Sequence, residues 1–430
     1  MFKLYKFLKN KFSRLGPGFI TGAADDDPSG VATYSIAGAQ FGYRLNWLCL
    51  FLTPMMVAIQ EMCGRIGMCS GMGLAGVIKK FYSKKLLIFA VGLLLVANII
   101  NISADLGIMA ACFKMIFKLP FLFWLICVTV FTIFMEIVIP YRKYSFFLRF
   151  LGLTLLVYAV TAFIVKQNWL SLIKYTLIPH LSLDTAYLMT LVAFIGTTIS
   201  PYLFFWQASE EVEEEIIDGK ITEFNRKPYV NRKQINFLHR DTIFGMIFSN
   251  LIAAFIILTA AGALHANGIT NIETPQQAAM ALRPLAGNFA FLIFTIGIIS
   301  IGLQSVPILA GSVTYAVSEV FGFKEGLGKK LKQAKAFYFI LSLATLIGAL
   351  INIIGINPIR ALYYAAIING IISVPLIAII IKIANDQRVV GNYKITKINQ
   401  TIAWLTFIFV GVASALMIFN LFKSGFKVGA

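Results

Sequence analysis

Long apolar stretches recur along the whole chain and are separated by shorter polar segments. Most are about 20 residues or longer, which is the length a helix needs to cross the hydrocarbon core of a membrane. None shows the ten-residue alternation of a strand in a membrane β-barrel, so helices are the element that the pattern predicts. We therefore predict eleven spans, over approximately residues 17–41, 45–69, 85–112, 120–140, 145–166, 185–211, 241–264, 287–316, 334–354, 358–382 and 400–422.

Composition excludes a water-soluble globular protein. The 430 residues are 59% hydrophobic and 13% charged, whereas a soluble domain carries about a quarter charged residues. The net charge of +18 would suggest nucleic acid in a soluble protein. Here 28 of the 37 Lys and Arg residues fall in alternate loops that share one side with residues 1–15. The positive-inside rule therefore predicts a cytoplasmic N-terminus, an external C-terminus, a location in the cell membrane and no nucleic-acid partner.

The largest polar stretch, residues 209–240, changes from acidic to basic along its length. It is too short and too polar to form the core of a second domain. We interpret it as a solvated cytoplasmic linker, with a regulatory metal or partner site in its acidic half as the alternative. Residues 1–430 are thus predicted to form one membrane transport domain.

The first predicted span contains a feature that a lipid-facing helix would not tolerate. Asp25, Asp26 and Asp27, followed by Pro28, fall near the middle of an apolar run. Each buried acidic side chain costs about 2.5–3.5 kcal/mol even on the lenient insertion scale, and proline removes a backbone donor. The helix should unwind here, exposing carboxylates and carbonyls that suit a hard cation. The alternative is a loop that follows a short amphipathic N-terminal helix.

A second break of the same kind lies at residues 196–201, where Gly-Thr-Thr-Ile-Ser-Pro interrupts the sixth span. Each break falls in the first span of a five-span half, 17–166 and 185–382, with 400–422 as an additional helix. An odd number of spans per half makes the two halves insert in opposite orientations. Interrupted helices at corresponding positions of inverted repeats indicate a transporter site near the membrane centre. A proline kink without function remains the alternative for the second break alone.

Several segments resemble the NRAMP family of divalent-metal transporters. Residues 16–43, GPGFITGAADDDPSGVATYSIAGAQFGY, look like the first helix of that family, whose signature is an Asp-Pro-Gly-Asn break. Residues 60–71 resemble its second helix, and 239–250 and 284–311 resemble its seventh and eighth. The similarity covers roughly residues 14–420. It implies an all-α integral membrane protein with a LeuT-like fold, a 5+5 inverted repeat and broken helices one and six.

The chain departs from the family pattern at both breaks. Residues 27–30 read Asp-Pro-Ser-Gly instead of Asp-Pro-Gly-Asn, and residues 200–202 read Ser-Pro-Tyr instead of Met-Pro-His. In the family, the aspartate, asparagine and methionine ligate metal, and a backbone carbonyl three residues before the methionine also binds. The resemblance therefore implies Asp27, Gly30, Ser200 and Thr197 as site positions. The chain loses the soft thioether, one amide and the histidine of proton handling, as the NRAMP-related magnesium transporters do.

The complete set of candidate metal-site residues is Asp27, Gly30, Ala24, Thr197, Ser200, Asn369, Gln304 and Asp26. Asp25 and Asp26 either attract cations in the outer vestibule or cap the unwound turn. Asp105 and Glu136 must face protein or water within the bundle, and Asp105 either lines the release path or has a structural partner. Glu61 and Arg65 are spaced for an intrahelical ion pair. The three histidines and the five cysteines are not predicted to bind metal.

Carboxylate, hydroxyl, carbonyl and water ligands suit Mg²⁺ and Mn²⁺, whereas a thioether favours softer metals. We therefore expect a secondary transporter, not an enzyme, that moves Mg²⁺ in preference to Mn²⁺ and needs no obligatory proton coupling and no cofactor. The alternatives are a proton-coupled Mn²⁺ or Fe²⁺ transporter and a sodium-coupled amino-acid permease. The sequence leaves the oligomeric state open.

Overall fold

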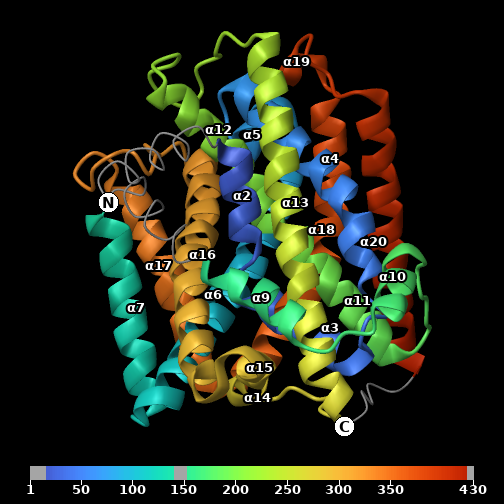
Figure 1. The fold of residues 1–430 in the computed structure, drawn as a ribbon. Coiled ribbons are helices and arrows are strands. Elements are labelled where there is room, and N and C mark those ends of the chain that lie inside the picture. The colour runs from blue at the N-terminus through green and yellow to red at the C-terminus, as the bar shows by residue number, and fades with distance from the viewer. Residues whose placement is uncertain (1–15, 140–152, 424–430) are drawn as a thin grey trace, which may run out of the picture.

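The computed structural model describes residues 16–139 and 153–423, and these ranges form a bundle of helices (Figure 1). The first half contains α2 (Pro17–Asp25), α3 (Pro28–Phe41), α4 (Trp47–Ser70), α5 (Leu74–Phe81), α6 (Lys84–Phe117), α7 (Phe121–Val138), α9 (Leu156–Ile164) and α10 (Trp169–Leu177). The second contains α11 (Thr185–Thr198), α12 (Pro201–Ile217), α13 (Arg232–Ala263), α14 (Pro275–Ala279), α15 (Arg283–Ala286), α16 (Ala290–Phe321), α17 (Lys335–Ile351), α18 (Pro358–Ala384), α19 (Gln387–Val390) and α20 (Lys397–Lys423).

Nine segments of the described residues are long and apolar enough to cross a membrane, and α11 with α12 makes one of them. The broken first span, α2 with α3, adds a tenth. The fifth predicted span, 145–166, begins outside the described residues and continues in α9. Two segments that we predict to be cytoplasmic, residues 1–15 and the basic loop at 142–149, also lie outside the described residues. The described residues therefore account for ten of the eleven predicted spans, and the fifth stays a prediction.

The two halves pack on each other in equivalent ways, as an inverted repeat requires. The second half-helix α3 packs along α13, and its counterpart α12 packs along α4. Both crossings bring backbones together without side chains between them. A Cβ atom on Gly38 of α3 would overlap the carbonyl of Ile257, and one on Gly67 of α4 would overlap the carbonyl of Ala208. Glycine is required at these crossings because any side chain would push the helices apart.

The acidic half of residues 209–240 is not the solvated linker that we predicted. It continues α12 as far as Ile217, and its glutamates are buried against neighbouring helices. Glu211 accepts a hydrogen bond from Gln207 (2.8 Å), and Glu213 accepts one from Tyr315 (2.7 Å). The prediction was wrong because glutamate favours helix, and these side chains find donors on packed helices. Only residues 218–231 form the connecting loop.

The loops gather at the two ends of the bundle as the charge pattern predicts. Helices α5 and α19 and the end of α12 lie at the upper end in Figure 1, whereas α10, α14 and α15 lie at the lower end. The upper end carries the loops rich in Lys and Arg. Its assignment to the cytoplasm stays a prediction from the positive-inside rule.

Candidate metal site at the two helix breaks

The first break lies between α2 and α3. The helix ends at Asp25, the chain is non-helical at Asp26 and Asp27, and Pro28 begins α3. Asp27 is the N-cap of α3, since one of its carboxylate oxygens accepts hydrogen bonds from the Gly30 amide (2.8 Å) and the Ser29 hydroxyl (2.6 Å). An aspartate followed by proline is a favourable start for a helix. The break therefore holds a carboxylate at the positive end of α3.

The second break separates α11 from α12 at Ile199 and Ser200, and Pro201 begins α12. Ser200 occupies the N-cap position, but its side chain does not cap α12. Instead its hydroxyl donates back to the carbonyls of Gly196 and Thr197, both at 2.7 Å. These bonds hold the hydroxyl oxygen beside the Thr197 carbonyl. The break thus presents two hard oxygen atoms of the residues predicted as ligands.

Hydrogen bonds join the two breaks directly. The Tyr202 hydroxyl donates to the carbonyl of Ala24 (3.1 Å), which links the start of α12 to the end of α2, and the same tyrosine lies beside Asp27. On the other side, the Tyr34 hydroxyl of α3 lies 3.3 Å from the hydroxyl of Thr197 and 3.2 Å from that of Thr198. The candidates Ala24, Asp27 and Thr197 are therefore brought together around the facing ends of four half-helices.

Four buried carboxylates surround this region. Asp25, Asp26 and Asp27 are between 0% and 2% exposed, and Asp105 of α6 is fully buried and lies close enough to Asp27 to repel it. Ser249 of α13 donates to Asp25 (2.7 Å) and lies 3.4 Å from Asp26. One oxygen each of Asp25, Asp26 and Asp105 has no hydrogen-bond partner among the residues that the structure describes.

The described surroundings of these four carboxylates contain a hydroxyl donor but no basic partner. Ser305 donates to the other oxygen of Asp105 (2.6 Å). In the described part of the chain, none of these four carboxylates pairs with Lys or Arg. Within the same part, no three Asp, Glu, His or Cys side chains are arranged as a ready metal centre. The site therefore offers single carboxylates together with hydroxyls and carbonyls.

The remaining candidates occupy the surrounding helices. Gly30 contributes its amide to Asp27, and a side chain at this position would begin 3.2 Å from the ring of Tyr34. Asn369 of α18 exchanges hydrogen bonds with Asn101 of α6, at 2.9 and 3.2 Å. Gln304 is buried on α16, next to the serine that contacts Asp105. The structure thus places Asn369 in an amide pair, which leaves its role as a ligand a prediction.

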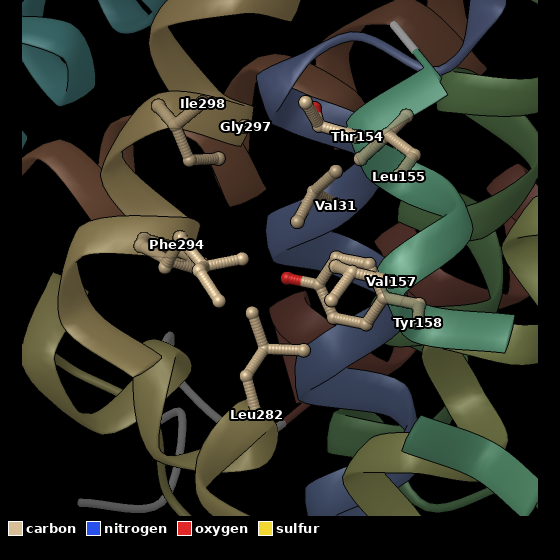
Figure 2. A pocket seen from close by; sticks show the side chains of 10 residues that line it. Val31, Thr154, Leu155, Val157, Tyr158, Leu282, Phe294, Gly297 and Ile298 are labelled. Atoms are coloured by element: carbon tan, nitrogen blue, oxygen red, sulfur yellow. The ribbon is translucent and has the colours of Figure 1, made fainter. Parts of the chain in front are cut away.

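The carboxylates at the breaks are shielded from solvent, being 0% to 2% exposed. Towards α14 and α15, a pocket of only ≈ 10 Å³ lies between α3, α9 and α16, where Val31 and Tyr158 face Phe294 and Ile298 (Figure 2). Such a volume holds at most about one water molecule. Towards the other end, Asp241 of α13 accepts hydrogen bonds from the first amides of α2, Gly16 (2.9 Å) and Phe19 (3.0 Å). The carboxylates are therefore enclosed within the bundle.

The predicted ion pair of Glu61 and Arg65 is confirmed, with Nε of Arg65 at 2.9 Å from the carboxylate. The other oxygen of Glu61 lies 2.8 Å from His239 of α13 and accepts from Asn399 of α20 (2.6 Å). All five cysteines are free. Glu136 lies within reach of Thr345 on α17, at 3.3 Å.

Sequence reasoning missed Tyr34, Ser249 and Asp241. Of these, Ser249 and Asp241 could have been found, because each is polar within the apolar pattern of the seventh span. Tyr34 gave no such signal, since an aromatic residue is ordinary in a membrane helix.

Residues 18–420 match the Nramp family, described as natural resistance-associated macrophage protein-like. The chain belongs to this family. Among curated relatives, the divalent metal cation transporter MntH of Listeria monocytogenes is 23% identical, over 96% of this chain and 91% of its own length. MntH of Klebsiella pneumoniae is 26% identical, over 92% of this chain and 91% of its own.

Solved structures show the same fold for this Nramp chain. The manganese transporter of Eremococcus coleocola gives a TM-score of 0.72 at 16% identity, covering 96% of this chain and 87% of that one. Mhp1, a nucleobase-cation-symport-1 family transporter, gives 0.61 at 9% identity, covering 95% and 93%. The LeuT-like fold with two broken helices is thereby confirmed, and the protein is a multi-pass membrane protein.

Proposed function

We propose that this Nramp protein moves a divalent metal cation across the membrane by alternating access, with the cation bound between the two helix breaks. The observation that carries the proposal is the group of four buried carboxylates, Asp25, Asp26, Asp27 and Asp105, without a basic partner in the described residues. Uncompensated buried charge is costly, and a divalent cation would offset it. The metals named for the MntH and manganese-transporter relatives support the same class of substrate.

Within that class, we propose Mg²⁺ as the favoured ion, with Mn²⁺ also admitted. The oxygen atoms of Asp27, Ser200 and Thr197 are hard donors, and no thioether stands at either break. Such donors suit Mg²⁺ and Mn²⁺, and Mg²⁺ keeps several of its waters while binding one or two carboxylates. Ser200 and Gly30 stand at the positions where the family has larger ligands.

We further propose that protons are not obligatorily co-transported. Tyr202 stands where the family has histidine, and its hydroxyl donates to the Ala24 carbonyl and lies beside Asp27. An unperturbed phenol does not exchange protons near neutral pH as imidazole does. We therefore propose that Tyr202 joins α2 to α12 and does not relay protons.

Uptake into proteoliposomes tests these proposals. Vesicles carrying an internal pH dye should take up Mg²⁺ and Mn²⁺, and less Ca²⁺, without acidification that scales with metal entry. Asp27→Ala should abolish uptake while preserving a monodisperse protein, because the cation loses its direct carboxylate ligand. The exposed Asp218 supplies the control Asp218→Ala, which should transport normally.

Three results would count against the proposals. Near-normal Mg²⁺ uptake by Asp27→Ala would remove Asp27 as the ligand and make Asp26 the next candidate. Metal-dependent acidification of the lumen would favour the proton-coupled alternative. Sodium-driven amino-acid uptake without metal uptake would replace the substrate class altogether.

A further inference from the structure

A second cavity, which is polar, lies between α5, the last turn of α16 and the loop that follows α16. These elements lie at the upper end of the bundle in Figure 1. Its volume is ≈ 470 Å³, enough for a metal ion with several waters. Glu319 is fourteen residues beyond Ser305 on α16, so about 21 Å of helix separates this cavity from the carboxylates at the breaks. It is a separate site from the one described above.

Three buried acceptors line this cavity without a partner. Among the described residues, none donates a hydrogen bond to the hydroxyl of Ser318 or to one carboxylate oxygen each of Glu319 and Glu325, and the hydroxyl itself finds no acceptor. The three residues are 0%, 6% and 4% exposed, respectively. Buried polar atoms are normally satisfied, and an unsatisfied group calls for an explanation. Three such groups around one cavity indicate that a ligand supplies what the protein does not.

The surrounding contacts fix the two carboxylates. The other oxygen of Glu319 accepts a hydrogen bond from the Gly76 amide (2.9 Å) in the first turn of α5, which holds the side chain in place. A third carboxylate, that of Glu213 on α12, repels Glu325. Lys79 is exposed at the rim, where its ammonium group donates to the main-chain carbonyl of Glu319 (3.0 Å). The floor of the cavity is therefore acidic and rich in acceptors, and the positive charges lie at its edge.

We propose that this cavity binds a divalent metal cation through the carboxylates of Glu319 and Glu325 and the hydroxyl of Ser318, with water completing the coordination. One or two carboxylates with several waters are the usual protein environment of Mg²⁺. A bound cation would tie the end of α16 to α5 and to the loop beyond α16. This site is on the predicted cytoplasmic side and does not depend on the proposed transport site.

Equilibrium dialysis of purified protein against Mn²⁺ tests the proposal, with Asp27→Ala as background so that the transport site is disabled. This background should bind one Mn²⁺ per chain. Adding Glu325→Gln or Ser318→Ala should weaken this binding, by more than tenfold for Glu325→Gln. Adding Glu223→Gln, on an exposed glutamate of the neighbouring loop, should leave it unchanged.

A change at the rim tests the sign of the charge that the cavity attracts. Lys79→Gln removes a positive charge and should tighten Mn²⁺ binding several-fold, whereas it would weaken binding of an anionic ligand. The proposal is overturned if the Asp27→Ala protein binds no Mn²⁺, or if Glu325→Gln binds it as tightly as the background does. The transport site is tested separately by comparing the number of Mn²⁺ ions bound per chain in the wild-type protein and in Asp27→Ala, which should bind one fewer.

Discussion

Neutralising Asp241 should loosen the first half of the broken helix α2. This helix has no N-cap side chain of its own, because Gly16 occupies that position. The carboxylate of Asp241 on α13 takes over the role by accepting from the amides of Gly16 and Phe19, at 2.9 and 3.0 Å. In Asp241→Asn one oxygen still accepts, but the amide nitrogen now faces a backbone donor. At least one of the two bonds is lost.

The size of the effect follows from the measured cost of removing helix N-caps. Removing an N-cap side chain costs about 0.5–2 kcal/mol, and hydrogen bonds to charged groups fall at the upper end of such values. We expect about 1–2 kcal/mol, which corresponds to a roughly 5- to 30-fold larger population of undocked α2. Asp241 also repels Glu211, so its neutralisation relieves some strain elsewhere. A local measurement is therefore required, because global stability would mix the two effects.

Hydrogen–deuterium exchange of the amides in residues 19–25 supplies that measurement. Asp241→Asn should accelerate exchange there by about the 5- to 30-fold estimated above from the loss of a cap. Asp184→Ala is the control, since Asp184 is the N-cap of α11 and accepts a hydrogen bond from the Tyr187 amide (3.2 Å), and alanine cannot replace that cap. It should accelerate exchange at the start of α11 and leave α2 unchanged. Unaltered exchange in α2 of the Asp241 variant would refute the reasoning.

Two other substitutions test the packing and the ion preference. Gly196→Ala should lower the melting temperature of the protein in detergent, because the new Cβ would overlap the carbonyl of Ala366 on α18. Overpacking of this kind costs about 1–3 kcal/mol. Gly92→Ala is the control and should leave the melting temperature unchanged, since its Cβ would meet nothing within 4 Å. Ser200→Met should increase the inhibition of uptake by Cd²⁺ and reduce Mg²⁺ uptake. Adding Gly30→Asn should strengthen both effects once the Tyr34 ring, which lies 3.2 Å from the new Cβ, moves aside. Unchanged Cd²⁺ competition curves for the double variant would show that selectivity is set elsewhere.

The helix breaks were predictable from sequence because they violate two local rules at once. Proline and consecutive aspartates are both unfavourable inside a membrane helix, so Asp27 and Pro201 could be placed without any contact information. The Glu61–Arg65 pair was equally accessible, since its partners are four residues apart on one helix.

The contacts between distant segments could not be predicted in this way. The bond from Tyr202 to Ala24 joins residues 178 positions apart, and nothing in either local sequence specifies it. The same holds for Asn369, whose partner Asn101 is 268 positions away. The buried glutamates of α12 were mispredicted for a related reason, because local polarity indicates solvent only when no donor on another helix is available.

The seam between α13 and the broken first helix has a consequence for how the chain is made. Gly18 and Gly22 of α2 and Gly38 of α3 meet the backbone of α13 directly, and the cap from Asp241 comes from 225 residues further along the chain. A growing polypeptide therefore presents its three consecutive aspartates to the membrane long before the helix that shelters them has been translated. We expect the first span to enter the bilayer last, or to wait beside the insertion machinery, so that assembly of the bundle is completed only after the seventh span has emerged.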